Sequence, residues 1–163
     1  MTQRCIFLVP ETDRLERIQR LRSSYDPLAD AVPPHLTVVF PFAIDWPPER
    51  LAALLDGQAK ALPIPFALGG PVERDGWMSF PLTRGAAQVA RLHAALHALL
   101  PPRLWSDRPF VPHVTFGQRS GRPALDALRE AAEVLPCMGT LRRMVLERIG
   151  RQGLSIPEHE VSS

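Results

Sequence analysis

The chain has few of the residues that cross-link extracellular domains or build metal sites. Its 163 residues include only two cysteines, Cys5 and Cys137. These cysteines lack the spacing of a metal site and are too few for a disulfide framework. We therefore expect two buried free thiols in a reducing compartment, and a cytoplasmic protein.

Long apolar runs and lysines are scarce as well. The apolar stretch 5–9 is bounded by Arg4 and Pro10, and is too short for the core of a signal peptide or for a membrane span. It predicts a buried strand and no membrane association. Lys60 is the only lysine, so arginine carries nearly all of the positive charge, and guanidinium groups suit bidentate contacts with phosphate. The net charge of +2 tolerates an anionic ligand but does not by itself indicate nucleic-acid binding.

The length and the apolar content of 45% suit one compact domain, 1–163, built from two similar halves. Apolar periodicity, glycines and prolines predict an alternation of strands and helices. The expected strands are 5–9, 35–40, 64–68, 77–82, 110–116, 141–149 and a last short one at 154–156, and the expected helices are 11–22, 46–62, 83–100 and 124–135.

The most informative feature is a motif that occurs twice. Pro34-His35-Leu36-Thr37 and Pro112-His113-Val114-Thr115 both lie in runs that favour a strand, and the two histidines are 78 residues apart, about half the chain. Because side chains alternate faces along a strand, each histidine is expected on the same face as its threonine. A strand and a helix are expected before each copy, which indicates two lobes related by internal pseudo-symmetry.

The repeated motif supplies the groups that open a phosphodiester. Two histidines in opposite protonation states provide a general base and a general acid near neutral pH. The hydroxyl groups of Thr37 and Thr115 provide hydrogen bonds to phosphoryl oxygens. This set requires no metal, no cofactor and no nucleophilic side chain.

The segments PPHLTVVFPF and RPFVPHVTFG resemble the paired His-x-Thr motifs of the 2H phosphoesterase superfamily, and specifically its 2'-5' RNA ligase-like (LigT-like) branch; the run 22–27 before the first motif is similar too. The resemblance implies a bilobal α+β fold, with two pseudo-symmetric lobes of antiparallel sheet and flanking helices around a central cleft. It implies that His35, Thr37, His113 and Thr115 are catalytic. It also implies that the substrate is an RNA end or small nucleotide with a 2',3'-cyclic phosphate or a 2'-5' linkage.

Three further residues are candidates for substrate binding. Arg22 is a possible phosphate contact and Tyr25 a possible platform for base stacking, although both also suit a helix end followed by a turn. Relatives often have a basic residue soon after the second motif, and here Gln118 is followed by Arg119. Few basic or aromatic residues surround the motifs, which favours a small cyclic phosphate over a long RNA.

Two other functions remain open for the same site. It either runs in reverse, joining RNA ends through a 2'-5' bond, or it binds RNA ends or nucleotides without catalysis. The expected partner is the substrate itself, an RNA end or small nucleotide with a cyclic phosphate. The sequence leaves the oligomeric state open and favours a monomer.

The remaining histidines and aromatic residues are weaker candidates. His93 and His97 are one helical turn apart, as in some zinc sites, but Ala94 replaces the glutamate of a zinc protease, so we expect ordinary helix histidines. His159 is expected in a loose polar tail without a partner. Trp105 and Arg108, before the second motif, are possible substrate contacts.

Overall fold

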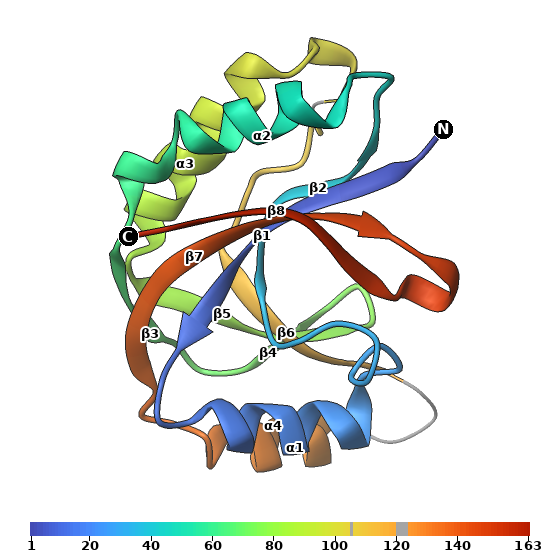
Figure 1. Ribbon diagram of the computed structural model, residues 1–163. Helices are drawn as coiled ribbons and strands as arrows, with labels where there is room; N and C mark the ends of the chain where they lie inside the picture. Colours follow the sequence, from blue (N-terminus) through green and yellow to red (C-terminus); the bar gives the residue numbers. More distant parts are fainter. Residues whose placement is uncertain (105, 120–123) are drawn as a thin grey trace.

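The fold alternates strands and helices along the whole chain (Figure 1). The computed structural model describes residues 1–104, 106–119 and 124–163. The elements in these residues are β1 (Gln3–Glu11), α1 (Leu15–Tyr25), β2 (Leu36–Ala43), α2 (Pro48–Asp56), β3 (Ile64–Leu68), β4 (Val72–Arg74), β5 (Trp77–Arg84), α3 (Ala86–Leu99), β6 (His113–Gln118), α4 (Ala124–Ala132), β7 (Met138–Ile149) and β8 (Ser155–Ser162), with 3-10 turns at Ala59–Ala61, Pro102–Leu104 and Arg151–Gly153.

The order of these elements repeats halfway along the chain. The first half runs β1-α1-β2-α2-β3-β4 and the second runs β5-α3-β6-α4-β7-β8. In both halves the first strand pairs antiparallel with the strand that carries the motif, β1 with β2 and β5 with β6. The α+β fold with two pseudo-symmetric halves, predicted from the motif spacing and the family resemblance, is confirmed.

The two halves share one eight-stranded antiparallel sheet. Strand β7 pairs with β1 along one edge, and with β3 and β8 along the other. Strand β5 pairs with β3, β4 and β6. The lobes are therefore joined through the β3–β7 pairing, and both motif strands, β2 and β6, end up at edges of the sheet.

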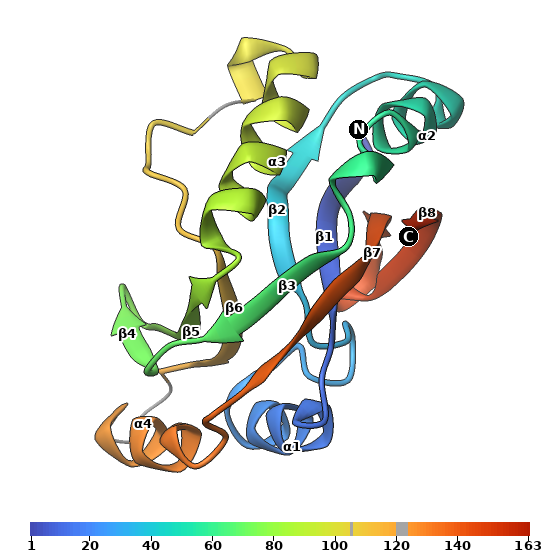
Figure 2. The same ribbon diagram turned by 90° about the vertical axis from the view of Figure 1, so that its left-hand side faces the viewer.

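One helix from each half packs against the motif strand of the other half. Helix α1, from the first half, packs against β6, whereas α3, from the second half, packs against β2. Helices α1 and α4 lie together at one end of the molecule, and α2 and α3 lie together at the other (Figures 1 and 2). Each motif strand is thus supported by a helix of the opposite half.

Strand β1 has apolar residues on both faces and separates two apolar clusters. Ile6 and Leu8 belong to the main core, while Phe7 and Val9 pack with Val145 of β7 on the other face. Phe7 lies on the same face of the sheet as the first motif, because its ring contacts the ring of His35. The two ring centroids are 5.0 Å apart.

The C-terminal segment differs from the sequence-based expectation. It forms the eight-residue strand β8, and His159 is ordered within it, with Nε2 at 2.7 Å from Asp56 Oδ1. The prediction of a loose tail with an unpartnered histidine was therefore wrong. Residues 155–162 are too polar to indicate a buried strand, but they pair antiparallel with β7, and cross-strand ion pairs such as Arg143 with Glu160 and Arg148 with Glu158 accompany this pairing.

Smaller differences concern where the helices begin and end. Helix α1 continues to Tyr25, beyond the predicted end at 22, and α4 ends at Ala132, before the predicted end at 135. Helix α3 begins only at Ala86 because Gly85 adopts φ +85°, a left-handed conformation that stops the helix from starting earlier. None of the helices in the described residues is long and apolar enough to cross a bilayer.

Candidate active site

The two His-x-Thr motifs have the same pattern of burial. His35 and Thr37 are partly exposed while Leu36 between them is buried, and His113, Val114 and Thr115 repeat this order. The intervening residues, Leu36 and Val114, both belong to the main core. Core packing of the middle residue therefore presents the histidine and the threonine of each motif on the opposite face.

Both histidine rings are held by the same hydrogen bond. Nδ1 of His35 lies 2.8 Å from the carbonyl oxygen of Pro33, and Nδ1 of His113 lies 2.7 Å from that of Val111. Because a carbonyl oxygen only accepts, Nδ1 carries the proton in each ring. In the neutral form, Nε2 is then the nitrogen with the free lone pair, and in the charged form it carries the proton that can be donated.

The fold brings the two half-sites together, where a half-site is the histidine and threonine of one motif. Strands β2 and β6 lie in contact although they pair with different neighbours in the sheet. The histidines are also close enough to interact electrostatically, since the charge of His113 contributes to lowering the pKa of His35. The site thus contains two rings of the same tautomer, one from each half of the chain.

The surroundings of His35 favour its neutral form. Burial is the largest cause that lowers the pKa of His35 below its ordinary value of 6.5, and it outweighs the hydrogen bond to Pro33, which raises that pKa. The nearby Arg22 lowers the pKa further, whereas Asp26 raises it. His35 is therefore uncharged at neutral pH.

Arg22 lies inside the protein and not on the surface of the site. Its side chain is 1% exposed and donates hydrogen bonds to Asp26, to Gln19 and to the carbonyl oxygen of Leu28. This placement agrees with the second sequence-based interpretation, a helix end followed by a turn. It does not agree with a direct phosphate contact, because the guanidinium group is enclosed by protein.

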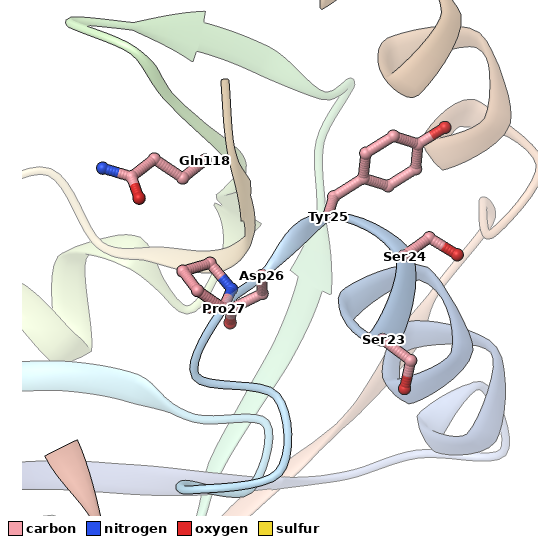
Figure 3. Close-up of a pocket in the computed structure, with 6 residues that line it drawn as sticks. All are labelled: Ser23, Ser24, Tyr25, Asp26, Pro27 and Gln118. Atoms are coloured by element: carbon pink, nitrogen blue, oxygen red, sulfur yellow. The ribbon is translucent and has the colours of Figure 1, made fainter. Parts of the chain in front are cut away.

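Tyr25 and Gln118 border an open hollow of about 340 Å³ beside the second motif strand (Figure 3). The Tyr25 hydroxyl donates to Glu130 Oε2 on α4 at 2.6 Å, and the ring points away from Gln118 (Figure 3). Arg119 is exposed at the end of β6, and its backbone N–H donates to the carbonyl oxygen of Gly76. Substrate contacts by Tyr25 and Arg119 stay predictions. Trp105 lies outside the described residues, and the exposed Arg108 lies in the connection before β6.

Sequence reasoning did not identify Cys5 as a neighbour of Thr37. Cys5, on the neighbouring strand β1, donates its thiol to the carbonyl oxygen of Val39 at 3.2 Å and also interacts with the Thr37 hydroxyl. Burial, together with the charge of Glu147, raises the pKa of Cys5 to about 12. Only the β1–β2 register places these groups together, and no local sequence signal reveals that register.

The histidine pair on α3 also has specific partners. His93 contacts the backbone of β2 and the ring of Phe110, and its own ring lies 4.2 Å from that of His97. In the residues that the structure describes, no group of three or more histidine, cysteine, aspartate or glutamate side chains is arranged to hold a metal ion.

One protein-family model matches most of the chain. The model of the 2'-5' RNA ligase superfamily matches residues 9–153. The chain belongs to this superfamily. The matched range contains both His-x-Thr motifs, as the resemblance of the motifs predicted. No curated protein matches the sequence.

Solved structures show that the superfamily fold extends over the whole chain. A crystal structure described as a phosphoesterase matches with a TM-score of 0.68 at 15% identity, covering 99% of this chain and 98% of that one. E. coli LigT complexed with NADP+ matches with 0.67 at 15% identity, and LigT complexed with 3'-AMP with 0.66 at 16%; both cover 99% of this chain and 97% of LigT. At this identity the likeness establishes the fold alone.

Proposed function

We propose that this member of the 2'-5' RNA ligase superfamily is a phosphoesterase that hydrolyses 2',3'-cyclic phosphates or 2'-5' phosphodiester linkages in RNA ends or small nucleotides. The observation that carries the proposal is the matched pair of histidines. Each ring is fixed by Nδ1 to a backbone carbonyl two residues upstream, which leaves Nε2 of both rings for proton transfer.

In this scheme His35 is the general base. Its lowered pKa keeps the ring neutral at neutral pH, so that Nε2 accepts the proton of the attacking water. The water oxygen forms a bond to phosphorus as the bond between phosphorus and the leaving ribose oxygen breaks. A charged imidazolium in this position would have no lone pair for the proton.

His113 is the general acid that completes the reaction. Its Nε2 donates a proton to the leaving ribose oxygen, so the two histidines exchange protonation states in one turnover. The hydroxyl groups of Thr37 and Thr115 donate to the non-bridging oxygens, where negative charge increases in the transition state. Acid, base and anion donors all come from side chains, and the scheme involves no metal or cofactor.

The relatives support a nucleotide substrate. LigT has been crystallised with 3'-AMP, with NADP+, with ATP and with phosphate, all of which contain a phosphate group. We infer that the site formed by the two His-x-Thr motifs of this chain accepts a nucleotide. The free buried thiols of Cys5 and Cys137 support the proposed cytoplasmic location.

The reverse reaction, 2'-5' ligation, uses the same groups with their roles exchanged. It is the second candidate because the superfamily is named for that activity. A non-catalytic nucleotide binder is the third candidate, and the pairing of two titratable rings argues against it, since anion binding alone needs no matched acid and base.

The proposal is tested with a 2',3'-cyclic nucleotide and the purified protein in the presence of a chelator. We expect a single monophosphate regioisomer, with kcat reduced by roughly 10³-fold or more in His35→Ala and His113→Ala. His159→Ala is the matched control, because it removes a histidine that bonds Asp56 away from both motifs.

Retention of activity by either motif variant would refute the two-histidine mechanism. If the wild-type protein instead joins RNA ends and does not open the cyclic phosphate, ligation is the function. Nucleotide binding without turnover in either assay would identify a binding protein.

A further inference from the structure

His93 touches structural elements of both half-sites at once. It lies on α3, is partly buried, and its Nδ1 is 2.6 Å from the carbonyl oxygen of Val38 in β2. Val38 directly follows Thr37 of the first motif. Because the carbonyl oxygen accepts, Nδ1 of His93 donates in this hydrogen bond, which is short for a bond of this type.

The same ring stacks on Phe110. The two ring centroids are 3.8 Å apart and the planes differ by 2°. Phe110 precedes Val111, whose carbonyl oxygen holds Nδ1 of His113. The next residue, Pro112, accepts a hydrogen bond from the backbone N–H of Leu82 on β5, so this short segment leads directly into the second motif.

The two contacts of His93 involve strands that the sheet does not join to each other. Strands β2 and β6 are edge strands that each pair with one neighbour in the described residues, so the sheet ladder does not connect them to each other. A two-histidine site requires the motifs to keep a fixed separation, because a displacement of about 1 Å in an active site can cost roughly 100-fold in rate. His93 connects the two edges from the side of α3.

The neighbouring histidine is compatible with this role. Burial, followed by the influence of His93, lowers the pKa of His97, whose ring lies 4.2 Å away. His97 is therefore neutral at neutral pH. It places no positive charge beside the His93 ring.

We propose that His93 is a positioning residue that couples the two half-sites, by holding the Val38 carbonyl of the first motif strand and the Phe110 ring at the entry to the second. Its effect on turnover rests on the proposed function. Its effect on the geometry of His35 and His113 does not.

Two variants separate the two contacts. His93→Asn keeps an amide N–H donor near the position of Nδ1 but loses the stacking surface, whereas His93→Phe keeps a ring against Phe110 but loses the donor. His93→Ala removes both. His159→Asn is the matched control, since it alters a histidine that hydrogen-bonds Asp56 and belongs to neither motif.

The first measurement is imidazole nitrogen NMR of the unliganded protein at a pH high enough for both imidazoles to be neutral, so that the signals report the tautomers of His35 and His113 without any substrate. In His93→Ala we expect both rings to lose their uniform Nδ1–H tautomer. His93→Asn restores the His35 signal, and His93→Phe restores the His113 signal. His159→Asn leaves both signals as in the wild type.

The second measurement is turnover of a 2',3'-cyclic nucleotide. We expect kcat of His93→Ala to fall roughly 10-fold or more with KM changed less than about twofold, and the Asn and Phe variants to lie between Ala and wild type. If His93→Ala does not fold, the Asn and Phe variants still decide, because each retains one contact.

Unchanged tautomer signals in the His93 variants, or kcat within about twofold of wild type in all of them, would overturn the coupling role. A wild-type protein without turnover would refute the proposed function and not the coupling, which the tautomer signals decide on their own.

Discussion

Arg22 and Asp26 form a buried ion pair at the end of α1, close to His35 of the first His-x-Thr motif. Arg22 Nη2 lies 3.0 Å from Asp26 Oδ2, and the two side chains are 1% and 6% exposed. The other carboxylate oxygen, Oδ1, accepts the backbone N–H of Leu28 at 2.9 Å. The pair therefore fixes the turn that leads from α1 towards His35, and its charges influence the pKa of that histidine.

Arg22→Met should destabilise the protein strongly, because it leaves the carboxylate of Asp26 buried without its counter-charge. We expect a loss of about 3 kcal/mol or more in the free energy of unfolding, measured by urea denaturation. The double variant Arg22→Met with Asp26→Leu should recover most of this loss, since it removes both charges. Arg143→Met, which breaks the exposed pair with Glu160, is the control and should cost less than about 1 kcal/mol.

The pH dependence of activity should reflect the neutral state of His35. A general base loses activity as pH falls through its pKa, and burial lowers the pKa of His35 below 6.5. The acidic limb of kcat/KM should therefore have its midpoint below pH 6.5. The same shift makes the unfolded chain bind more protons than the folded one just below pH 6.5, so this histidine reduces stability as the solution becomes more acidic.

The effect of the Arg22 charge on the pKa of His35 can be tested in the same pH profile of kcat/KM. Arg22 lowers the pKa of His35 and Asp26 raises it, so Arg22→Gln should move the acidic limb to higher pH. Arg22→Lys keeps the positive charge and should leave the limb close to its wild-type position. A limb that stays in place in Arg22→Gln would show that the charge of Arg22 does not contribute to the pKa of His35.

The threonine hydroxyls should matter for turnover but not for folding. Thr37→Val and Thr115→Val preserve the branched shape that suits a strand while removing the proposed donor to the phosphoryl oxygens. We expect kcat to fall roughly 100-fold in each, with thermal stability close to wild type. Thr→Ser at either position keeps the hydroxyl and should retain most of the activity, so equal losses in the Val and Ser variants would contradict the anion-donor role.

The sequence predicted the parts of the site that depend on local pattern. Side chains alternate faces along a strand, so Leu36 and Val114 point to one face while the histidine and threonine of each motif point to the other. A proline precedes each histidine, and the paired motifs were therefore recognisable without a structure. Burial of Arg22 was not predictable, because an arginine four residues before an aspartate occurs equally on exposed helix ends. The partners of His93 come from two other elements, and only tertiary packing brings Val38 and Phe110 to one ring.

The thiol of Cys5 should be unreactive in the folded protein. Its pKa is raised to about 12 by burial, so almost none of it is thiolate at pH 8, and its side chain is 4% exposed. Iodoacetamide at pH 8 should therefore leave Cys5 unmodified in the native protein and label it in urea, as judged by peptide mass spectrometry. Rapid labelling of the native peptide would show that β1 opens away from Thr37.

Glu147, opposite Cys5 in the β1–β7 register, is a destabilising buried acid. Its side chain is 6% exposed, and Oε2 has no hydrogen-bond partner among the residues that the structure describes. Burial raises its pKa above 4.5, although the nearby Ser155 hydroxyl lowers it in part. Above pH 4.5 the folded state therefore binds more protons than the unfolded state, so this group costs stability as pH rises.

Glu147→Gln should stabilise the protein at pH 7 by about 1 kcal/mol, since it removes the charge while keeping the shape of the side chain. The advantage over wild type should disappear below pH 4.5, where the carboxyl is protonated in both folded and unfolded states. Glu160→Gln on β8, an exposed carboxylate, is the control and should change stability by less than about 0.5 kcal/mol. Thermal denaturation of the three proteins at pH 4 and pH 7 distinguishes these outcomes, and an advantage for Glu147→Gln that is equal at both pH values would mean that the pKa of this carboxyl is the same in the folded and unfolded states.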